Sequence, residues 1–198
     1  AFPGLQPQRA RARLYADGSA VVQLGTQEFG TGAVTAMTQV AADGLGVAID
    51  RIDLEYGDTD LPNISAAVGS AGAGMQSAAV HGATTALRDQ LIARVIADDK
   101  SPLHDADPKA VMVHDGRIML RDHPEIGETY SELLKRNFLE DVEAASGWNP
   151  VGANSSYAQM TFGAQFAEVA VDADLGLVRV RRMVGAFAPG RVLNAKTA

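Results

Sequence analysis

The sequence predicts an α+β fold in which antiparallel or mixed sheets, built from β-hairpins, carry helices packed on one face. Three segments alternate apolar and polar residues on either side of a turn signal, as β-hairpins do. The stretches between them repeat apolar residues at helical spacing. Strands and helices are therefore interspersed, and most strand pairs are adjacent in sequence. The recurrence of a hairpin followed by a helix also suggests duplicated ββαβ-type units, with sub-units at 1–100 and 101–198.

The hairpins are predicted from their turns. Asp17-Gly18 and Asp115-Gly116 are two-residue turn signals, because both residue types tolerate the positive φ that tight hairpin turns require. The third hairpin has a longer turn at 172–176, between strands that alternate apolar and polar residues.

Three helices and one further strand are predicted from periodicity. The first helix covers 33–45, where apolar residues share one face, and Gly46 is a plausible C-terminal stop. The longest helix runs from about 75 to 96. A shorter helix lies within 126–139, with Leu133, Leu134 and Phe138 on one side. The stretch RIDLEYGDT is predicted to be a strand that ends in a turn.

Composition narrows the functional classes. The 198 residues carry a net charge of -7 with a pI near 5.0, which argues against nucleic-acid binding because such proteins need a basic surface. No apolar run approaches the roughly 18–20 residues that span a bilayer, so we expect no membrane insertion. Without cysteine, this chain alone can form no disulfide, zinc-thiolate or iron-sulfur site. We expect a globular protein in the cytoplasm, with the periplasm as the alternative.

A first glycine-rich loop, GTQEFGTG at 25–32, runs into the first predicted helix. Its spacing fits the start of a P-loop, but Thr31 and Gly32 stand where lysine and serine or threonine would bind phosphate and magnesium. The preceding strand belongs to a hairpin rather than to a parallel βαβ unit, so the loop also fits a dinucleotide fingerprint poorly. Free N–H groups at the helix N-terminus, near Ala33, would suit an anion. The alternative is a strand-to-helix turn that binds no ligand.

A second loop, VGSAGAGMQSA at 68–78, precedes the longest helix. Gln76 and Ser77 are neutral hydrogen-bond donors, and the small residues around them would let a bulky ligand lie against the backbone. Two such loops exceed what a simple fold requires, so we expect a large phosphorylated cofactor rather than free phosphate. The alternative is a flexible linker.

Other candidate residues point to weaker hypotheses. Glu28, beside the glycines of the first loop, fits either a general acid or base or a glutamate that is solvated or lies in the N-terminal turn of the helix. The histidines show no metal-ligand spacing, and Ser155 and Ser156 lack a nucleophile motif. The arginines at 9, 11 and 13 are expected on one solvated face of a strand.

Two long stretches of the chain resemble a known family. The first is YADGSAVVQLGTQEFGTGAVTAMTQVAADGLGVAIDRIDLEYGDTDLP, residues 15–62, and the second is FGAQFAEVAVDADLGLVRVRRMVGAFAPGRVLN, residues 162–194. Together they are similar to the second molybdenum-cofactor-binding region in the large subunit of xanthine dehydrogenases and aldehyde oxidoreductases, the molybdenum hydroxylases. The resemblance covers nearly the whole chain in the same order, so it implies one cofactor-binding domain over 1–198.

The resemblance implies a molybdopterin-type molybdenum cofactor, in bacteria commonly the cytosine dinucleotide form, whose pterin and phosphates lie on the two loops. It also implies that the pterin dithiolene holds the metal, so that no side chain of this chain is a metal ligand. The cofactor-binding residues that it implies are Phe29, Gly30, Thr31 and Gly32 in the first loop and Gly72, Ala73, Gly74, Met75, Gln76 and Ser77 in the second.

One residue departs from the family pattern. Thr31 stands where many members have glutamine in a Gly-Gln-Gly motif. A threonine hydroxyl can still form a hydrogen bond but reaches less far, so we expect that contact to be shorter, water-bridged or lost. Gly-Thr-Gly occurs in a bacterial branch that resembles aldehyde oxidoreductases, which favours aldehydes over purines as substrates.

The implied reaction is hydroxylation of an aldehyde or a purine-like N-heterocycle with oxygen derived from water. The family's catalytic glutamate lies in a Gly-x-Gly-Glu motif, and none follows Asn194, so we expect a fragment that has no catalytic residue and is inactive alone. Expected partners are the rest of its large subunit, iron-sulfur and FAD domains or subunits, and the substrate. The alternatives are a non-catalytic structural or assembly module and a generic nucleotide-phosphate-binding domain.

Overall fold

A four-stranded mixed sheet forms the centre of the molecule. The computed structural model describes residues 7–62, 67–70, 72–148 and 161–196. The strand order is β3-β2-β1-β7, with β2 and β3 parallel and the other pairs antiparallel. These strands are β1 (Gln8–Tyr15), β2 (Ala20–Gln23), β3 (Ile52–Glu55) and β7 (Asp141–Trp148). The predicted α+β class and the hairpin at Asp17-Gly18 are confirmed.

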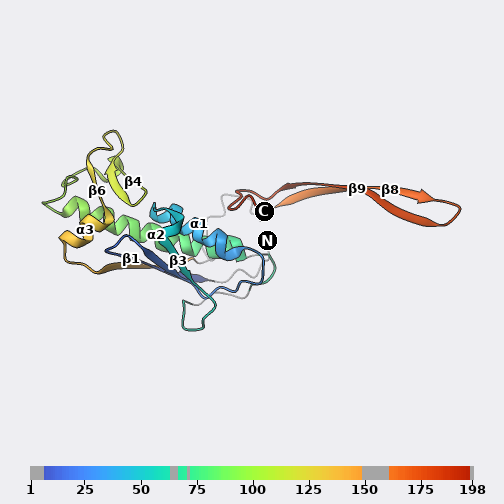
Figure 1. Ribbon diagram of the computed structural model, residues 1–198, viewed down its shortest axis with the longest axis horizontal. Coiled ribbons are helices and arrows are strands. Elements are labelled where there is room, and N and C mark those ends of the chain that lie inside the picture. Colours follow the sequence, from blue (N-terminus) through green and yellow to red (C-terminus); the bar gives the residue numbers. More distant parts are fainter. Residues whose placement is uncertain (1–6, 63–66, 71, 149–160, 197–198) are drawn as a thin grey trace.

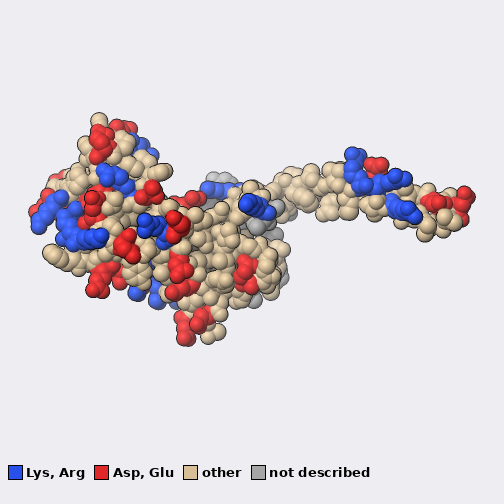
Figure 2. All heavy atoms as spheres, in the orientation of Figure 1, with Lys and Arg blue, Asp and Glu red and all other residues tan. Residues whose placement is uncertain are grey.

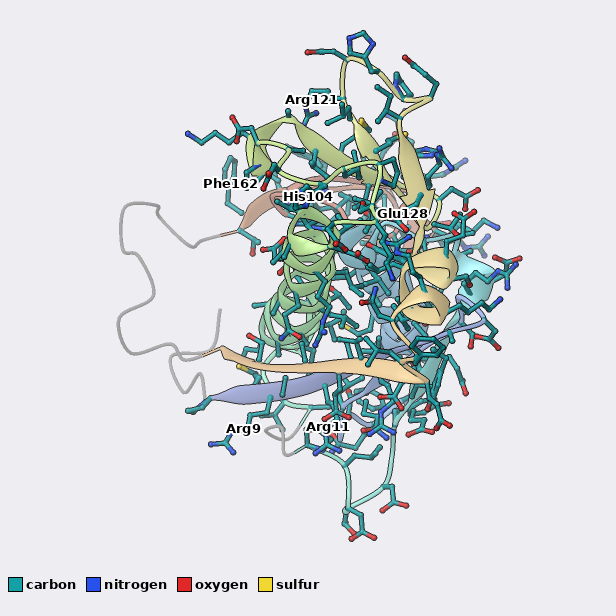
Figure 3. The ribbon with its side chains drawn as sticks, turned by 90° about the vertical axis from the view of Figure 1, so that its left-hand side faces the viewer. Arg9, Arg11, His104, Arg121, Glu128 and Phe162 are labelled. Carbon is teal, nitrogen blue, oxygen red and sulfur yellow. The ribbon has the colours of Figure 1, made fainter. Side chains whose placement is uncertain are left out.

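Two helices cover one face of this sheet (Figure 1). They are α1 (Ala33–Leu45) and α2 (Gly72–Ala97), and the short 3₁₀ helix η1 (Ile49–Arg51) leads into β3. Alternate residues of β1 are buried beneath the helices, and two of them, Ala10 and Ala12, are small enough to let α2 approach closely. Arg9 and Arg11 point away from the helices on the opposite face, as the sequence predicts (Figure 3).

A second, three-stranded antiparallel sheet packs beside the C-terminal end of α1. Its strands are β4 (Val111–His114), β5 (Arg117–Leu120) and β6 (Gly127–Thr129). The 3₁₀ helix η2 (Pro108–Ala110) precedes β4, and the helix α3 (Tyr130–Arg136) follows β6. Asp115 and Gly116 both have positive φ, 49° and 72°, which confirms the predicted tight turn. The hydroxyl of buried Tyr130 donates to the Leu45 carbonyl at 2.7 Å, so this sheet is fastened to α1.

The third predicted hairpin is also confirmed. It consists of β8 (Phe162–Asp172) and β9 (Leu177–Ala188), and it extends away from the rest of the molecule (Figure 1). Every residue of β9 is exposed.

Three details differ from the sequence-based predictions. The helix predicted within 126–139 is shorter, because 127–129 form β6 and a capping box between Thr129 and Glu132 starts α3 only at Tyr130. Phe138 therefore lies beyond the helix with a positive φ of 55°, and it is exposed rather than packed beside Leu133 and Leu134. The longest helix begins at Gly72, three residues before the predicted start.

Strand β7 has no counterpart among the predicted elements. It pairs with the whole of β1, from Gln8 opposite Trp148 to Tyr15 opposite Asp141. A strand from the second half of the chain thus completes the sheet of the first half. The division into sub-units 1–100 and 101–198 stays a prediction.

Candidate functional site

A cavity of about 880 Å³ lies where the N-termini of α1 and α2 meet the base of the β8–β9 hairpin. Three segments line it: the first glycine-rich loop and the start of α1, the second loop and the start of α2, and residues 189–194 together with Thr161. Segments far apart in the sequence therefore converge on one space. A volume of this size suits a large ligand rather than a single phosphate.

The first loop is held by a side chain of its own. The Glu28 carboxylate accepts hydrogen bonds from the backbone N–H groups of Gly30 at 2.6 Å, Thr31 at 2.7 Å, Gly32 at 3.3 Å and Val34 at 3.1 Å. The bond from Val34, followed by those from the other three N–H groups, lowers the pKa of Glu28 to about 2.

The expectation that this loop offers these N–H groups to an anion is therefore wrong. Glu28 already occupies the position that a phosphate would take at the α1 N-terminus. Glu28 lies before Gly32, the N-cap of α1, and not in the first turn of the helix, yet its carboxylate caps this helix end. It is therefore committed to backbone donors rather than poised as a general base. Left-handed Gly30 and Gly32, with φ of 98° and 76°, let the loop close around it.

Residues of this loop line the cavity even though three of its N–H groups donate to Glu28. Phe29, Thr31 and Gly32 line the space, and Phe29 is 67% exposed. Gly30 does not line it. Within the described residues the Thr31 hydroxyl makes only a long contact of 3.4 Å with Glu28 and thus retains hydrogen-bonding capacity toward the cavity.

The second loop differs, because its sequence at 68–78 contains no acidic residue that could act as Glu28 does in the first loop. Gln76 lines the cavity and is only 3% exposed, yet its Oε1 has no hydrogen-bond partner among the described residues. Buried polar atoms are nearly always paired, and leaving one unpaired costs about 1–3 kcal/mol. Thr26 Oγ1 is also buried without a hydrogen-bond partner among the described residues, but only Gln76 of the two lines the cavity, so its oxygen marks a polar point in this wall.

Most of the other residues predicted in this segment also line the cavity: Gly72, Ala73, Gly74 and Ser77. A side chain at Gly74 would meet nothing within 4 Å, so space above this turn is open to a ligand. Met75 is the exception, since it is buried on the other side of the helix, with its Sδ 3.9 Å from Nε2 of Gln8. Successive helical residues point about 100° apart, which explains the separation.

The third wall contains residues that the sequence did not lead us to predict. Arg191 is the only charged residue among the described residues that line the cavity. Asn194 donates from its Nδ2 to Oε1 of Gln39 at 3.0 Å and so fastens this segment to α1. The family-like stretch at 162–194 ends in Gly190-Arg191-x-x-Asn194, and this segment was the available signal. Only the tertiary structure shows that it meets the two loops.

The remaining candidate residues lie outside this cavity. None of the four histidines lines it. Within the described part of the chain, no three His, Cys, Asp or Glu side chains cluster as metal ligands, and no helix is long and apolar enough to cross a membrane. Ser155 and Ser156 fall outside the described residues. The cavity thus offers neutral donors, one cation and an orphaned acceptor, a set that fits a large ligand with an anionic portion.

Comparison with known proteins agrees with this chemistry. Residues 2–198 match a family described as molybdopterin cofactor-binding domain. The chain is 30% identical over 194 residues to the aldehyde oxidoreductase molybdenum-binding subunit PaoC of Escherichia coli, covering 98% of this chain and 24% of that subunit. It is 30% identical over 183 residues to the carbon monoxide dehydrogenase large chain of Afipia carboxidovorans, covering 87% and 21%.

Solved structures share the fold. Quinoline 2-oxidoreductase from Pseudomonas putida 86 superposes with a TM-score of 0.82 at 21% identity, over 98% of this chain and 25% of that one. The chain thus spans about a quarter of the length of the relatives that it matches. Since the family match covers nearly every residue, the chain belongs to the molybdopterin cofactor-binding domain family, whose relatives here are molybdenum-binding subunits of oxidoreductases.

Proposed function

We propose that this chain forms part of the cofactor site in the molybdenum-binding subunit of an oxidoreductase that hydroxylates aldehydes or N-heterocycles with oxygen from water. The observation that carries the proposal is the orphaned Oε1 of Gln76 in the wall of the large cavity, within a domain of the cofactor-binding family. Relatives named for aldehyde oxidation and for xanthine support both substrate classes.

The residues present fit the proposed cofactor. Gln76 would accept a hydrogen bond from a donor on the pterin, and the open turn at Gly74 would let a ring lie against the backbone. Arg191 would pair with a phosphate, since a guanidinium matches phosphate geometry and few other charges compete for it there. When bound, the cofactor would supply the redox chemistry that oxidises the substrate carbon.

The protein's contribution in this chain would be to bind and orient. Glu28 would hold the first loop in shape, so that Phe29 and Thr31 present their side chains to the ligand while the loop's N–H groups stay occupied. The role of Thr31 as a cofactor contact rests on family resemblance and on its place in the cavity wall.

The cofactor would be the cytosine dinucleotide form, and electrons would pass to iron-sulfur and FAD groups on other domains or subunits. The catalytic glutamate would come from a part of the parent outside these 198 residues, so this chain would not turn over alone. Aldehydes are the preferred substrate class, supported by the 30% identity to an aldehyde oxidoreductase subunit. The proposed location is the cytoplasm.

The test is elemental analysis of the full-length parent, with identification of any nucleotide released by acid. We expect about one molybdenum and one CMP per large subunit. A correctly matured parent without either would overturn the proposal and leave a structural module. If the parent lacks molybdenum and this chain binds CDP or ADP, the two results together would instead favour a generic nucleotide-phosphate-binding domain.

A further inference from the structure

The three walls of the cavity are fastened to the molecule with unequal strength. Two of them carry the N-terminal ends of α1 and α2, whose apolar residues form the core together with the sheet beneath them. These helices also lie close together, since Gly44 of α1 lies directly against Thr84 of α2 and its carbonyl accepts a hydrogen bond from Arg88 at 3.4 Å. Moving either of these two walls would therefore disrupt the core.

The third wall, residues 189–194, has far fewer contacts. Among the described residues, no hydrogen bond between backbone groups joins 189–196 to the rest of the chain. The half of the β8–β9 hairpin next to the body of the molecule presents no charged side chain (Figure 2), and the one ion pair of the described hairpin joins Glu168 to Arg182 within it. Leu193 is partly buried against the core. This wall is therefore the one that can move at little cost to the core.

Among the described residues, one side-chain hydrogen bond holds this wall to α1. The Nδ2 group of Asn194 donates to Oε1 of Gln39 at 3.0 Å, and Oδ1 of Asn194 accepts from the backbone N–H of Lys196 at 2.9 Å. The amide of Asn194 is thus held at both ends. Gln39 lies one turn along α1 from Ala36, which lines the cavity, but Gln39 itself does not line it. Gln39 can therefore hold the wall without contacting a ligand.

The other end of the wall contains a turn that suits a hinge. Strand β9 ends at Ala188, and Pro189 and Gly190 follow before Arg191. Gly190 has a positive φ of 85°, and a Cβ there would meet nothing within 4 Å, so neighbouring atoms do not restrict this turn. After β9 the chain returns from the hairpin to the body of the molecule (dark red in Figure 1). Arg191 therefore lies between a glycine turn and the hydrogen bond to Gln39.

We propose that Gln39 is a positioning residue: its hydrogen bond to Asn194 latches residues 189–194 against α1, keeps Arg191 at the cavity, and opens when the large ligand enters or leaves. Pockets usually bury most of a ligand's surface, so a wall that yields when one hydrogen bond breaks eases passage. The inference rests on the proposed function for the identity of the ligand, but the latch itself is a property of the chain with or without that ligand.

The first test uses trypsin on the full-length parent purified without cofactor, because trypsin cleaves after Arg191 when the wall opens. Gln39→Leu removes the acceptor for Asn194 and should raise the rate of this cleavage about fivefold, the factor that the loss of one ordinary hydrogen bond produces. Gln39→Glu keeps an acceptor at the same place and should restore the wild-type rate. Equal cleavage rates in these three proteins would overturn the latch.

Gln23→Leu is the matched control, because it makes the same substitution outside the cavity. Gln23 donates to Glu55 between β2 and β3, and neither residue lines the cavity, so cleavage after Arg191 should proceed at the wild-type rate. If this variant accelerates cleavage as much as Gln39→Leu does, the effect is a general loss of stability and the latch is wrong.

Molybdenum exchange in the parent separates a latch from a residue that only stabilises the fold. Gln39→Leu should release molybdenum about fivefold faster, and the cofactor-free variant should also take up cofactor extracted from the loaded wild-type parent faster, since a latch controls passage in both directions. Faster release without faster uptake would contradict the proposal. A parent without molybdenum would defeat the proposed function, while the trypsin result would still decide whether the latch exists. If Gln39→Leu does not fold, Gln39→Glu combined with Asn194→Asp places two carboxylates opposite each other and replaces it in both tests.

Discussion

The two glycine-rich loops look alike in sequence but satisfy their helix N-termini in different ways. Before α1, Glu28 folds back and accepts hydrogen bonds from four N–H groups. Before α2, the loop at 68–78 contains no acidic residue, and Gln76 keeps an unpaired, buried oxygen. A glycine-rich loop followed by a helix is therefore not by itself an anion site. Whether such a loop can bind an anionic ligand depends on whether a carboxylate of the chain, such as that of Glu28, already accepts hydrogen bonds from its N–H groups.

This difference assigns different work to the two loops. In the first loop the backbone is saturated, so any contact with a ligand has to come from side chains such as Phe29 and Thr31. In the second loop the backbone at Gly74 is open and Gln76 lacks a partner. The first loop is expected to shape the cavity, and the second to hold the ligand.

The largest effect should come from separating the two helices that carry these loops. Gly44 of α1 faces Thr84 of α2, and a Cβ at Gly44 would overlap with the threonine Oγ1. Gly44→Ala should lower the free energy of unfolding by about 1–3 kcal/mol, although alanine favours helix. Urea denaturation of the 198-residue chain, followed by circular dichroism, measures this.

Two further variants check that explanation. Gly74→Ala meets nothing within 4 Å, so it should leave stability unchanged or raise it by up to about 1 kcal/mol. Adding Thr84→Ala to Gly44→Ala should recover part of the loss. If the double variant recovers nothing, close packing between these helices is not what fixes the spacing of the two loops.

Gln76→Leu should separate ligand binding from stability. Leucine has nearly the same size and no polar atom, so the free energy of unfolding without cofactor should stay the same or rise slightly. The lost hydrogen bond should reduce the molybdenum content of the purified parent about five- to tenfold, the equivalent of about 1–1.4 kcal/mol. Elemental analysis and thermal melting measure the two quantities.

Thr85→Ala is the matched control for Gln76→Leu. Its hydroxyl lies on the same helix but bonds to the His81 carbonyl at 2.6 Å, outside the cavity, so molybdenum content should not change. A Gln76→Leu variant that unfolds more easily and keeps its molybdenum would show that Gln76 is a structural residue.

Glu28→Gln should weaken the first loop in a pH-dependent manner. The pKa of Glu28 is lowered from 4.5 to about 2 in the folded protein, so its stabilising effect is complete above pH 4.5 and is lost as pH falls toward 2. The variant should melt at a lower temperature than wild type at pH 7, and the two should converge toward pH 2. A gap that stays constant between pH 7 and pH 2 would contradict the capping role.

Much of this architecture can be predicted from local sequence signals. Asp-Gly turns and apolar periodicity are properties of neighbouring residues, and they predict the hairpins at Gly18 and Gly116 and the helices α1 and α2. Strand β7 was not predicted, because it has no turn signal and pairs with β1, which is more than 120 residues away. Short-range patterns carry no information about such a pairing.

The loop residues of the site could be predicted from the sequence, whereas the contacts that depend on tertiary structure could not. Eight of the ten expected loop residues line the cavity, since glycines and small side chains before a helix are a local signal. The cap formed by Glu28 depends on the positive φ of Gly30 and Gly32. The sequence does not determine these φ values, because glycine adopts positive and negative φ about equally well. The approach of Arg191 depends on how the hairpin returns to the body. The Glu28 cap and the approach of Arg191 both depend on the tertiary structure of the backbone, which local sequence patterns do not determine.

Thr31 should give the smallest effect and the finest test of how the loops differ. Its hydroxyl contacts Glu28 only at 3.4 Å in an exposed position, so Thr31→Val should change the free energy of unfolding by less than about 0.5 kcal/mol. If the first loop contacts the ligand only through side chains, this variant should lower the molybdenum content of the parent about two- to threefold. Thr31→Gln restores the longer donor and should retain or raise it. Loss of all molybdenum in Thr31→Val would mean that the first loop, and not Gln76 in the second, dominates binding.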